Sequence, residues 1–285
     1  MFYAQILVNG VLLGGLYGLM ALGMALVWGV LNIVNLAHGS LIMLGGYAVY
    51  YLFTIAGIDP FLALPLGMLI MFGFGFLIQR YIINFIVRSE LLNTLLITFG
   101  LDVVFTYLAQ LAFSADFRTI NPSYAGANLT LGGVVIPFVR LAAFGIAVAL
   151  AAGLWWLLSA TALGRAIRAT SQNLVAARLY GIAPSILYPV TFGIGAALAG
   201  AAGGLFGMVG QLTPYIGAEL TAKSFVIAII GSLDNPFRVL LGGCLIGIAE
   251  AFGAVYFGST YVNVISFGLL VLILVVRPAR SLRAA

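Results

Sequence analysis

The sequence predicts an all-α, polytopic membrane protein that forms one domain over residues 1–285. Hydrophobic residues make up 64% of the chain and charged residues only 7%. Because roughly 25% of the residues in a soluble domain are charged, this composition excludes a soluble protein. Apolar runs recur along the whole length, and most are near the roughly 20 residues that a helix needs to cross a bilayer. The membrane part is therefore the whole protein.

The first apolar run, residues 1–30, carries no Lys or Arg and is longer than the hydrophobic core of a signal peptide, so it predicts a retained span. The run at 219–233 is short, and residues 31–40 are polar enough to interrupt the membrane segments beside them. About eight or nine segments are expected, some of them broken within the membrane. After the first, they are expected at 39–57, 61–86, 91–113, 137–160, 184–208, 219–233, 237–257 and 261–277.

The basic residues predict the orientation, because Lys and Arg in short loops stay cytoplasmic. If the helices alternate, nine of the twelve Lys and Arg residues fall on one side. The N-terminus is therefore expected outside and the C-terminus in the cytoplasm. The same residues sit at segment ends without an interleaved aromatic patch, so nucleic acid is not an expected partner. The nine residues are Arg80, Arg88, Arg165, Arg168, Arg178, Arg238, Arg277, Arg280 and Arg283.

This orientation places residues 114–136 outside as an extracytoplasmic loop. Their Asn, Pro, Gly and alternating apolar residues are typical of a hairpin or an ordered loop.

Residues 161–183 contain a long polar, basic stretch, which the orientation places in the cytoplasm. Good helix formers run from Ala162 to Leu179, Gly181 is suited to end a helix, and Pro184 begins the next element. One or two short helices are expected on the cytoplasmic face.

The basic side chains of this loop, Arg165, Arg168 and Arg178, could bind anionic lipid headgroups. Yet a loop that only satisfies the charge rule needs a few residues rather than about twenty. Small Ala176 and Ala177 beside polar neighbours favour a docking surface for a soluble partner.

Residues 175–181, VAARLYG, resemble the signature loop of ABC importer permeases, in which Glu-Ala-Ala, three residues and Gly form the coupling helix that inserts into the ATPase subunit. Val175 stands where that pattern has Glu, so a salt bridge at this position is not carried over. The resemblance implies ATPase coupling for this loop. The candidate coupling residues are Arg165, Arg168, Asn173, Ala176, Ala177, Arg178 and Gly181.

Three segments, residues 9–47, 164–182 and 229–252, are similar in sequence and order to the permease of the high-affinity branched-chain amino-acid ABC importers. This resemblance implies a subunit of the bacterial inner membrane that forms the pathway for branched-chain or related amino acids. It implies as partners a second homologous permease, with a heterodimer favoured, two cytoplasmic ATPases and an extracytoplasmic binding protein. No cofactor and no enzymatic activity of its own are expected.

Two alternatives stay open at this point. Similar permeases serve urea, short amides and other small organic acids, so the substrate is not decided. A stand-alone secondary transporter or channel is less favoured, because it has no use for an ATPase docking helix.

The segment 217–224, GAELTAKS, lacks the second Gly of a phosphate-binding loop, so ATP is expected to bind another chain.

Polar residues interrupt the apolar sequence after the first run. Asn32, Asn35 and His38 are spaced by three and Gly39 follows. Polar groups at membrane depth are tolerated where they line a cavity or bond neighbouring helices. These residues therefore either line a translocation pathway or fix a broken helix by hydrogen bonds. His38 is the single histidine, so no metal site is expected.

Two carboxyl groups, Asp102 and Glu250, lie inside apolar runs, where their cost makes them functional candidates. A structural role is favoured, because an ATP-driven importer needs no proton relay. Glu219 and Lys223 are four residues apart and are expected to pair on one helix face. The polar segment 231–238 predicts a second break, with Asp234 as a helix cap or ion-pair partner.

Overall fold

The computed structural model describes residues 1–85, 91–231 and 235–276. Arg88, Asp234, Arg277, Arg280 and Arg283, which entered the sequence predictions, lie outside the described residues. Nine helices of the described part coincide closely with the predicted membrane segments. They are α1 (Phe2–Leu31), α2 (His38–Thr54), α3 (Pro60–Tyr81), α4 (Leu91–Phe113), α5 (Phe138–Ala160), α8 (Pro184–Val209), α9 (Gly217–Gly231), α10 (Pro236–Tyr256) and α11 (Val262–Val276).

Six helices in the described part are long and apolar enough to cross a membrane, namely α1, α3 with the short 3₁₀ helix η1 (Ile83–Phe85), α4, α5, α8 and α10. The chain is a polytopic helical membrane protein. The helices α2, α9 and α11 have 17, 15 and 15 residues. At 1.5 Å per residue they span about 22–26 Å, less than the roughly 30 Å hydrocarbon core.

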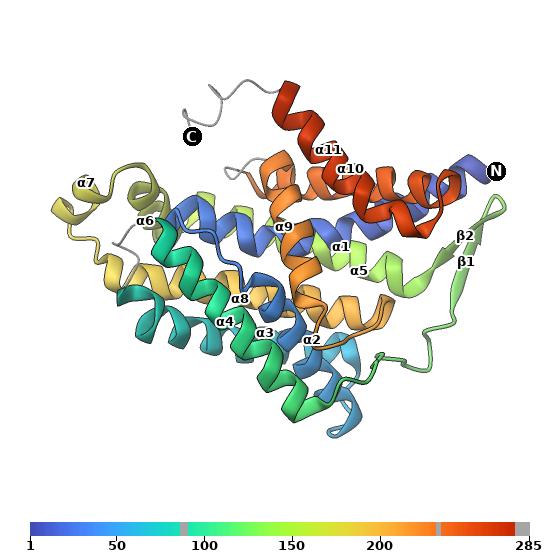
Figure 1. Ribbon diagram of the computed structural model, residues 1–285, viewed down its shortest axis with the longest axis horizontal. Helices are drawn as coiled ribbons and strands as arrows, with labels where there is room; N and C mark the ends of the chain where they lie inside the picture. The colour runs from blue at the N-terminus through green and yellow to red at the C-terminus, as the bar shows by residue number, and fades with distance from the viewer. Residues whose placement is uncertain (86–90, 232–234, 277–285) are drawn as a thin grey trace.

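The expected break after the first helix is present. α1 ends at Leu31, and its cap residue Asn32 adopts a left-handed backbone with φ of 54°. Residues 32–37 are not helical, and α2 begins at His38. The chain turns back along the bundle at this point (Figure 1).

The helix α1 forms the centre of the core, since most of its residues are buried. It packs closely on α10, because glycines let the two backbones approach. A Cβ added at Gly10 would lie 2.8 Å from the Cα of Ile248, and one at Gly18 would lie 2.9 Å from the Cα of Leu240. A third glycine, Gly203 on α8, lies against the carbonyl of Ile42 on α2, so glycine contacts also hold α8 in the core.

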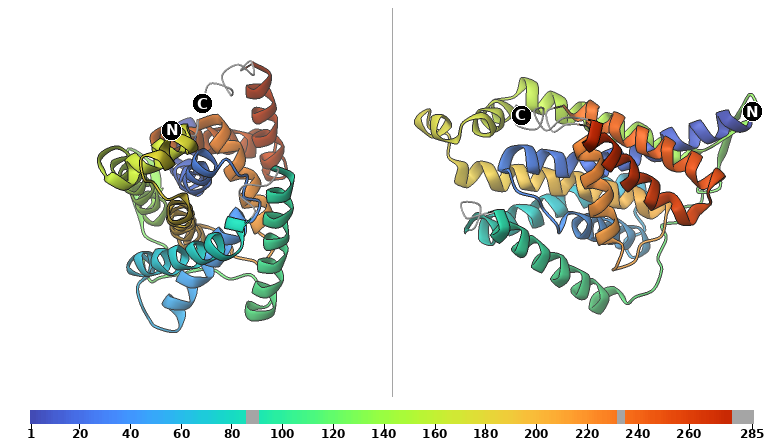
Figure 2. Two further views of the ribbon diagram at one scale, coloured as in Figure 1. Left: turned by 90° about the vertical axis from the view of Figure 1, so that its left-hand side faces the viewer. Right: turned by 45° about the horizontal axis from the view of Figure 1, so that its top comes forward.

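The two long loops predicted from the sequence lie at opposite ends of the helical bundle (Figures 1 and 2). One end carries the N-terminus and an antiparallel hairpin of β1 (Asn128–Leu131) and β2 (Val134–Pro137). Gly132 and Gly133 join the strands with φ of 57° and 81°, and two positive φ angles are the requirement of a type I′ turn. The expected hairpin is therefore confirmed, and it is the exception to the all-α class in the described part.

The other end carries α6 (Ala162–Gln172) and α7 (Leu174–Leu179), with α7 farthest from the bundle (Figure 1). Two short helices were among the predictions for this segment. Another short 3₁₀ helix, η2 (Ser259–Tyr261), precedes α11.

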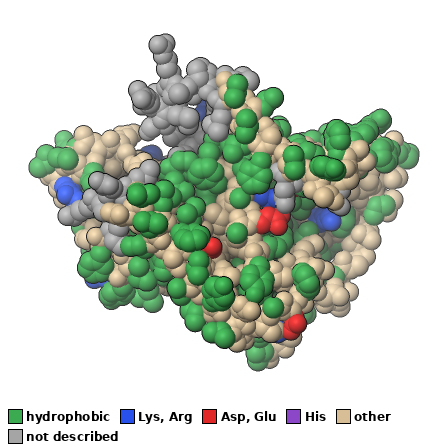
Figure 3. All heavy atoms as spheres, viewed as in Figure 1, with side chains coloured by type: hydrophobic (Ala, Val, Ile, Leu, Met, Phe, Trp, Pro, Cys, Tyr) green, Lys and Arg blue, Asp and Glu red, His purple; other side chains and the backbone are tan. Residues whose placement is uncertain are grey.

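Hydrophobic side chains cover much of the face on which α4, α9 and α11 lie (Figure 3). On α4, Leu96, Phe99 and Leu111 are 60%, 56% and 84% exposed. Apolar side chains exposed to this degree along a helix are expected to contact lipid or another membrane helix.

Candidate coupling and translocation sites

The helix α6 is fixed at its start and along one face. Thr161 caps it by accepting a hydrogen bond from the Gly164 N–H at 3.0 Å. Gly164, Ile167 and Thr170, three residues apart, are buried, whereas Arg168 is exposed. A Cβ at Gly164 would overlap with the backbone of α5 at its last turn. The close contact of α6 with α5 therefore requires a glycine here, which the sequence prediction did not identify.

Asn173 separates α6 from α7 and caps both of them. Its backbone N–H donates to the Ala169 carbonyl, and its Oδ1 accepts from the Ala176 N–H at 2.9 Å. An Asn at the first cap position satisfies a donor that the helix itself leaves free. Asn173 thus sets the point where the chain changes direction.

The helix α7 ends in the way that its Gly predicts. Gly181 has a φ of 81° and donates its N–H to the Arg178 carbonyl at 3.0 Å, while the Ile182 N–H donates to the Ala177 carbonyl at 3.1 Å. This is the hydrogen-bond pattern of a Schellman cap, which needs a left-handed residue. Gly181 is required for its backbone, since an added Cβ would meet no atom within 4 Å.

The exposed surface of the α7 segment is apolar. Val175, Leu179 and Tyr180 are 69%, 84% and 89% exposed. By contrast, Ala177 is buried and Ala176 is half-buried. The two alanines predicted to form the docking surface therefore lie mainly on the inner side, because a helix of this length presents different faces to the protein and to a partner.

The break between α1 and α2 is held by buried hydrogen bonds. His38 Nε2 donates to the Met20 carbonyl at 2.8 Å, and Asn35 Oδ1 accepts from the Ala37 N–H at 3.1 Å. The Gly39 N–H donates to Thr221 Oγ1 on α9 at 2.8 Å. Asn35 and His38 are only 2% and 1% exposed, so in this chain they lie among protein atoms.

Gly39 lies where α2 crosses α9. A Cβ added to it would overlap with the Gly217 carbonyl at the start of α9. Next to it, Ser40 Oγ donates to Asp102 Oδ1 on α4 at 2.5 Å. The Asp102 carboxyl therefore links α4 to the broken helix.

Glu250 pairs with a lysine that the sequence prediction did not assign to it. Lys223 Nζ lies 3.2 Å from Glu250 Oε1 and 3.7 Å from Glu219 Oε1. Lys223 also donates to the Tyr17 hydroxyl at 3.3 Å, and Ser266 donates to Glu250. The network joins α1, α9, α10 and α11. The predicted pair with Glu219 is present, but the shorter contact is to a residue 27 positions away, which a local pattern does not reveal.

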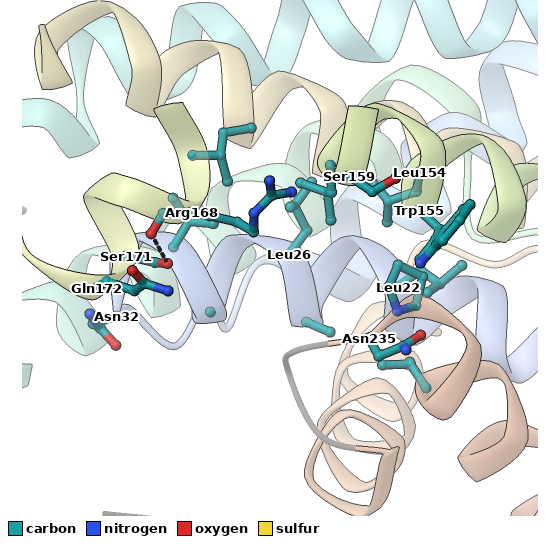
Figure 4. Close-up of a pocket in the computed structure, with 17 residues that line it drawn as sticks. Leu22, Leu26, Asn32, Leu154, Trp155, Ser159, Arg168, Ser171, Gln172 and Asn235 are labelled. Carbon is teal, nitrogen blue, oxygen red and sulfur yellow. Dashed lines mark hydrogen bonds between the residues drawn. The ribbon is translucent and has the colours of Figure 1, made fainter. Parts of the chain in front are cut away.

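A cavity of about 610 Å³ lies between α1, α5, α6 and the start of α10 (Figure 4). It brings together Asn32 and Arg168, which the sequence prediction placed in different sites. Asn35, His38 and Gly39 are not among its lining residues. In the described part of the chain no group of three or more His, Cys, Asp or Glu residues could hold a metal ion.

Comparison with known proteins identifies similar transport proteins. The family model described as the permease component of the branched-chain amino acid transport system matches residues 6–274. No solved structure matches the chain.

Three relatives are informative. The high-affinity branched-chain amino acid transport system permease protein BraD of Pseudomonas aeruginosa is 34% identical, over 97% of this chain and 94% of its own length. LivH of Escherichia coli K12, with the same description, is 30% identical over 98% of this chain and 94% of its own length. LivM of Salmonella typhimurium, also a permease protein of such a system, is 25% identical over 92% of this chain and 67% of its own length.

Proposed function

The chain belongs to the family of permease components of branched-chain amino acid transport systems, and from this premise we propose that it forms the translocation pathway of an ATP-driven importer for branched-chain or related amino acids. It is a transport component and not an enzyme. ATP is hydrolysed by separate cytoplasmic chains, and an extracytoplasmic binding protein delivers the substrate.

The observation that carries the proposal is the exposed apolar surface of the α7 segment, formed by Val175, Leu179 and Tyr180. Caps at both ends hold this short helix, and it lies beyond the ends of the long helices (Figure 2). A rigid helix with exposed apolar side chains fits a groove on a soluble partner. We assign α6 and α7 to coupling with one of two ATPases.

The orientation follows from the same assignment. Residues 161–183 lie in the cytoplasm, and residues 114–136 with the N-terminus lie outside. The separation of α7 from the β1–β2 hairpin along the long axis supports this orientation (Figure 1). The positive-inside distribution of arginines supports it independently. The protein is a multi-pass protein of the bacterial inner membrane with its C-terminus inside.

Nine helices lie at membrane depth, of which α2, α9 and α11 do not cross the full hydrocarbon core alone. The break between α1 and α2 shapes the translocation pathway, with Asn32 ending α1 and Asn35, His38 and Gly39 holding the form of the break. Broken helices near the midplane are a recurrent feature of transport sites. Asp102 and Glu250 are structural in this scheme.

The second permease is a homologous chain, so the membrane part is a heterodimer. Similarity to both LivH and LivM supports this proposal, because two related permease proteins then exist within one kind of system.

Tagged protein expressed with its genomic neighbours is expected to co-purify with a second permease and two ATPases. Substrate uptake by the purified chain alone in ATP-free vesicles would refute the importer assignment.

The substrate is tested separately, because selection can reside in the binding protein. Isothermal titration of leucine, isoleucine and valine into the neighbouring binding protein is expected to show binding, with urea and acetamide inert. Binding of urea or acetamide instead would move the chain to another substrate within the same family.

A further inference from the structure

The cavity between α1, α5, α6 and α10 has the shape of a groove along α1. Its floor runs from Leu22 to Asn32, ten residue steps that span about 15 Å along the helix. This length is half of the roughly 30 Å hydrocarbon core, the depth of one leaflet. Trp155 of α5 and Phe237 of α10 approach to 6.3 Å between ring centroids near one end of it.

Polar side chains lie toward both ends of the groove. Gln172 and Asn32 lie at one end, Ser159 and Asn235 lie with Trp155 toward the other, and the Arg168 side chain reaches between them (Figure 4). Apolar side chains lie between these ends, namely Ala25, Leu26, Leu154, Pro236 and Val239, although the exposed atoms of the lining as a whole are more polar than apolar. Asn235 lies near the deeper end, but its Oδ1 already accepts a hydrogen bond from the Phe237 N–H at 2.9 Å.

Among the described residues that line it, the groove carries one cation, Arg168, and no acid. Within the described residues the Arg168 guanidinium makes no hydrogen bond or ion pair, although its backbone carbonyl accepts from Ser171. An exposed guanidinium without a protein partner beside these side chains is suited to a phosphate group.

We propose that this groove binds an anionic phospholipid of the cytoplasmic leaflet, with its phosphate at Arg168 and an acyl chain along α1. The proposal rests on the proposed function in one respect, the placement of α6 at the cytoplasmic face. The lipid fills the space between α6 and the helices below it, so it braces the element that leads into α7.

The chemistry of the lining distinguishes this occupant from a free amino acid. An amino acid carries an ammonium group, and the lining residues that the structure describes offer no carboxylate to pair with it. The apolar wall of the groove is also longer than a leucine side chain. An anionic headgroup with a fatty chain satisfies both the guanidinium and the wall.

The test compares lipid binding by the purified full-length chain and three variants. Arg168→Gln removes the proposed phosphate ligand. Arg165→Gln is the matched control, because Arg165 is an exposed arginine on the same helix that does not line the groove. Ser159→Trp narrows the groove at an exposed position without changing the charge. Each protein is titrated with phosphatidylglycerol or phosphatidylcholine in detergent, and bound lipid per chain is measured by native mass spectrometry.

The wild type is expected to bind one phosphatidylglycerol more tightly than phosphatidylcholine. Arg168→Gln is expected to weaken phosphatidylglycerol binding about tenfold, Ser159→Trp to weaken binding of both lipids, and Arg165→Gln to change it less than about twofold. Equal effects of the two arginine variants would overturn the proposal. So would displacement of the lipid by millimolar leucine, which would identify an amino-acid site.

This measurement needs no ATPase, binding protein or transport. A failure of lipid binding therefore leaves the importer assignment untouched, and a failure of partner co-purification leaves the lipid site untouched.

Discussion

Removal of Lys223 is expected to destabilise the protein more than removal of its partner Glu250. In the folded chain Lys223 lies between two carboxylates, 3.2 Å from Glu250 and 3.7 Å from Glu219. Glu250 has a 3% exposed side chain, and the Ser266 hydroxyl that donates to it does not replace the positive charge when the lysine is lost. The Glu219 side chain is 50% exposed, so the two acids are not equivalent.

The magnitudes follow from this asymmetry. Lys223→Met leaves a buried carboxylate without its cation, which costs about 3–5 kcal/mol. Glu250→Gln leaves Lys223 with Glu219 and removes a charge-assisted hydrogen bond worth about 1.5–3 kcal/mol. Glu219→Gln removes a half-exposed contact and costs less than about 1 kcal/mol.

The assay is the apparent melting temperature of purified protein in one detergent. At about 2–4 °C per kcal/mol for roughly 150–250 residues, Lys223→Met is expected to lower it by at least about 6 °C. The double variant with Met at 223 and Leu at 250 is expected to melt above Lys223→Met, because no unpaired charge then remains. If Glu250→Gln is as damaging as Lys223→Met, or the double variant is the least stable, the reasoning is wrong.

Three further predictions concern the loop and the break. Gly181→Val is expected to abolish ATP-driven uptake without loss of membrane insertion. Gly181→Asn is expected to keep most of the uptake, because Asn tolerates the φ of 81° at this position. Unchanged transport by Gly181→Val would contradict a coupling role for Gly181. Asn173→Ala should lose about 1 kcal/mol of cap energy and reduce ATPase co-purification, and equal recovery of Asn173→Ala and Asn173→Ser would contradict the capping argument. Gly39→Ala should lower the yield of folded protein, measured by size-exclusion chromatography, because its Cβ overlaps with the backbone of α9. Gly100→Ala on α4 is the control, since its Cβ meets no atom within 4 Å, and similar yields of the two variants would count against the close packing.

The positions of the elements could be predicted from the sequence to within a few residues. The run expected at 137–160 is the helix Phe138–Ala160, and the one at 184–208 is Pro184–Val209. Hydrophobicity over about 20 residues is a local quantity, and prolines at helix starts mark the ends. The helix stop at Gly181 was also predictable, because a glycine that ends a helix is a local signal.

The candidate site was predictable only in part. The polar segment that forms α6 and α7 and the break at Asn32 to Gly39 were identified, because polar residues in an apolar chain are conspicuous. The inward orientation of Ala177 and the outward orientation of Leu179 and Tyr180 were not identified, since the orientation of α7 depends on its contact with α6.

The sequence by itself determined the membrane class, the order of the helices and the place of the polar loop, because each of these depends on composition within a short window. The tertiary structure decided which polar groups meet. His38 reaches Met20, Gly39 reaches Thr221 and Lys223 reaches Glu250 only after the helices have packed. The physical reason is that a buried polar group must find its partner across a helix interface, and small residues on both helices set which positions face each other there.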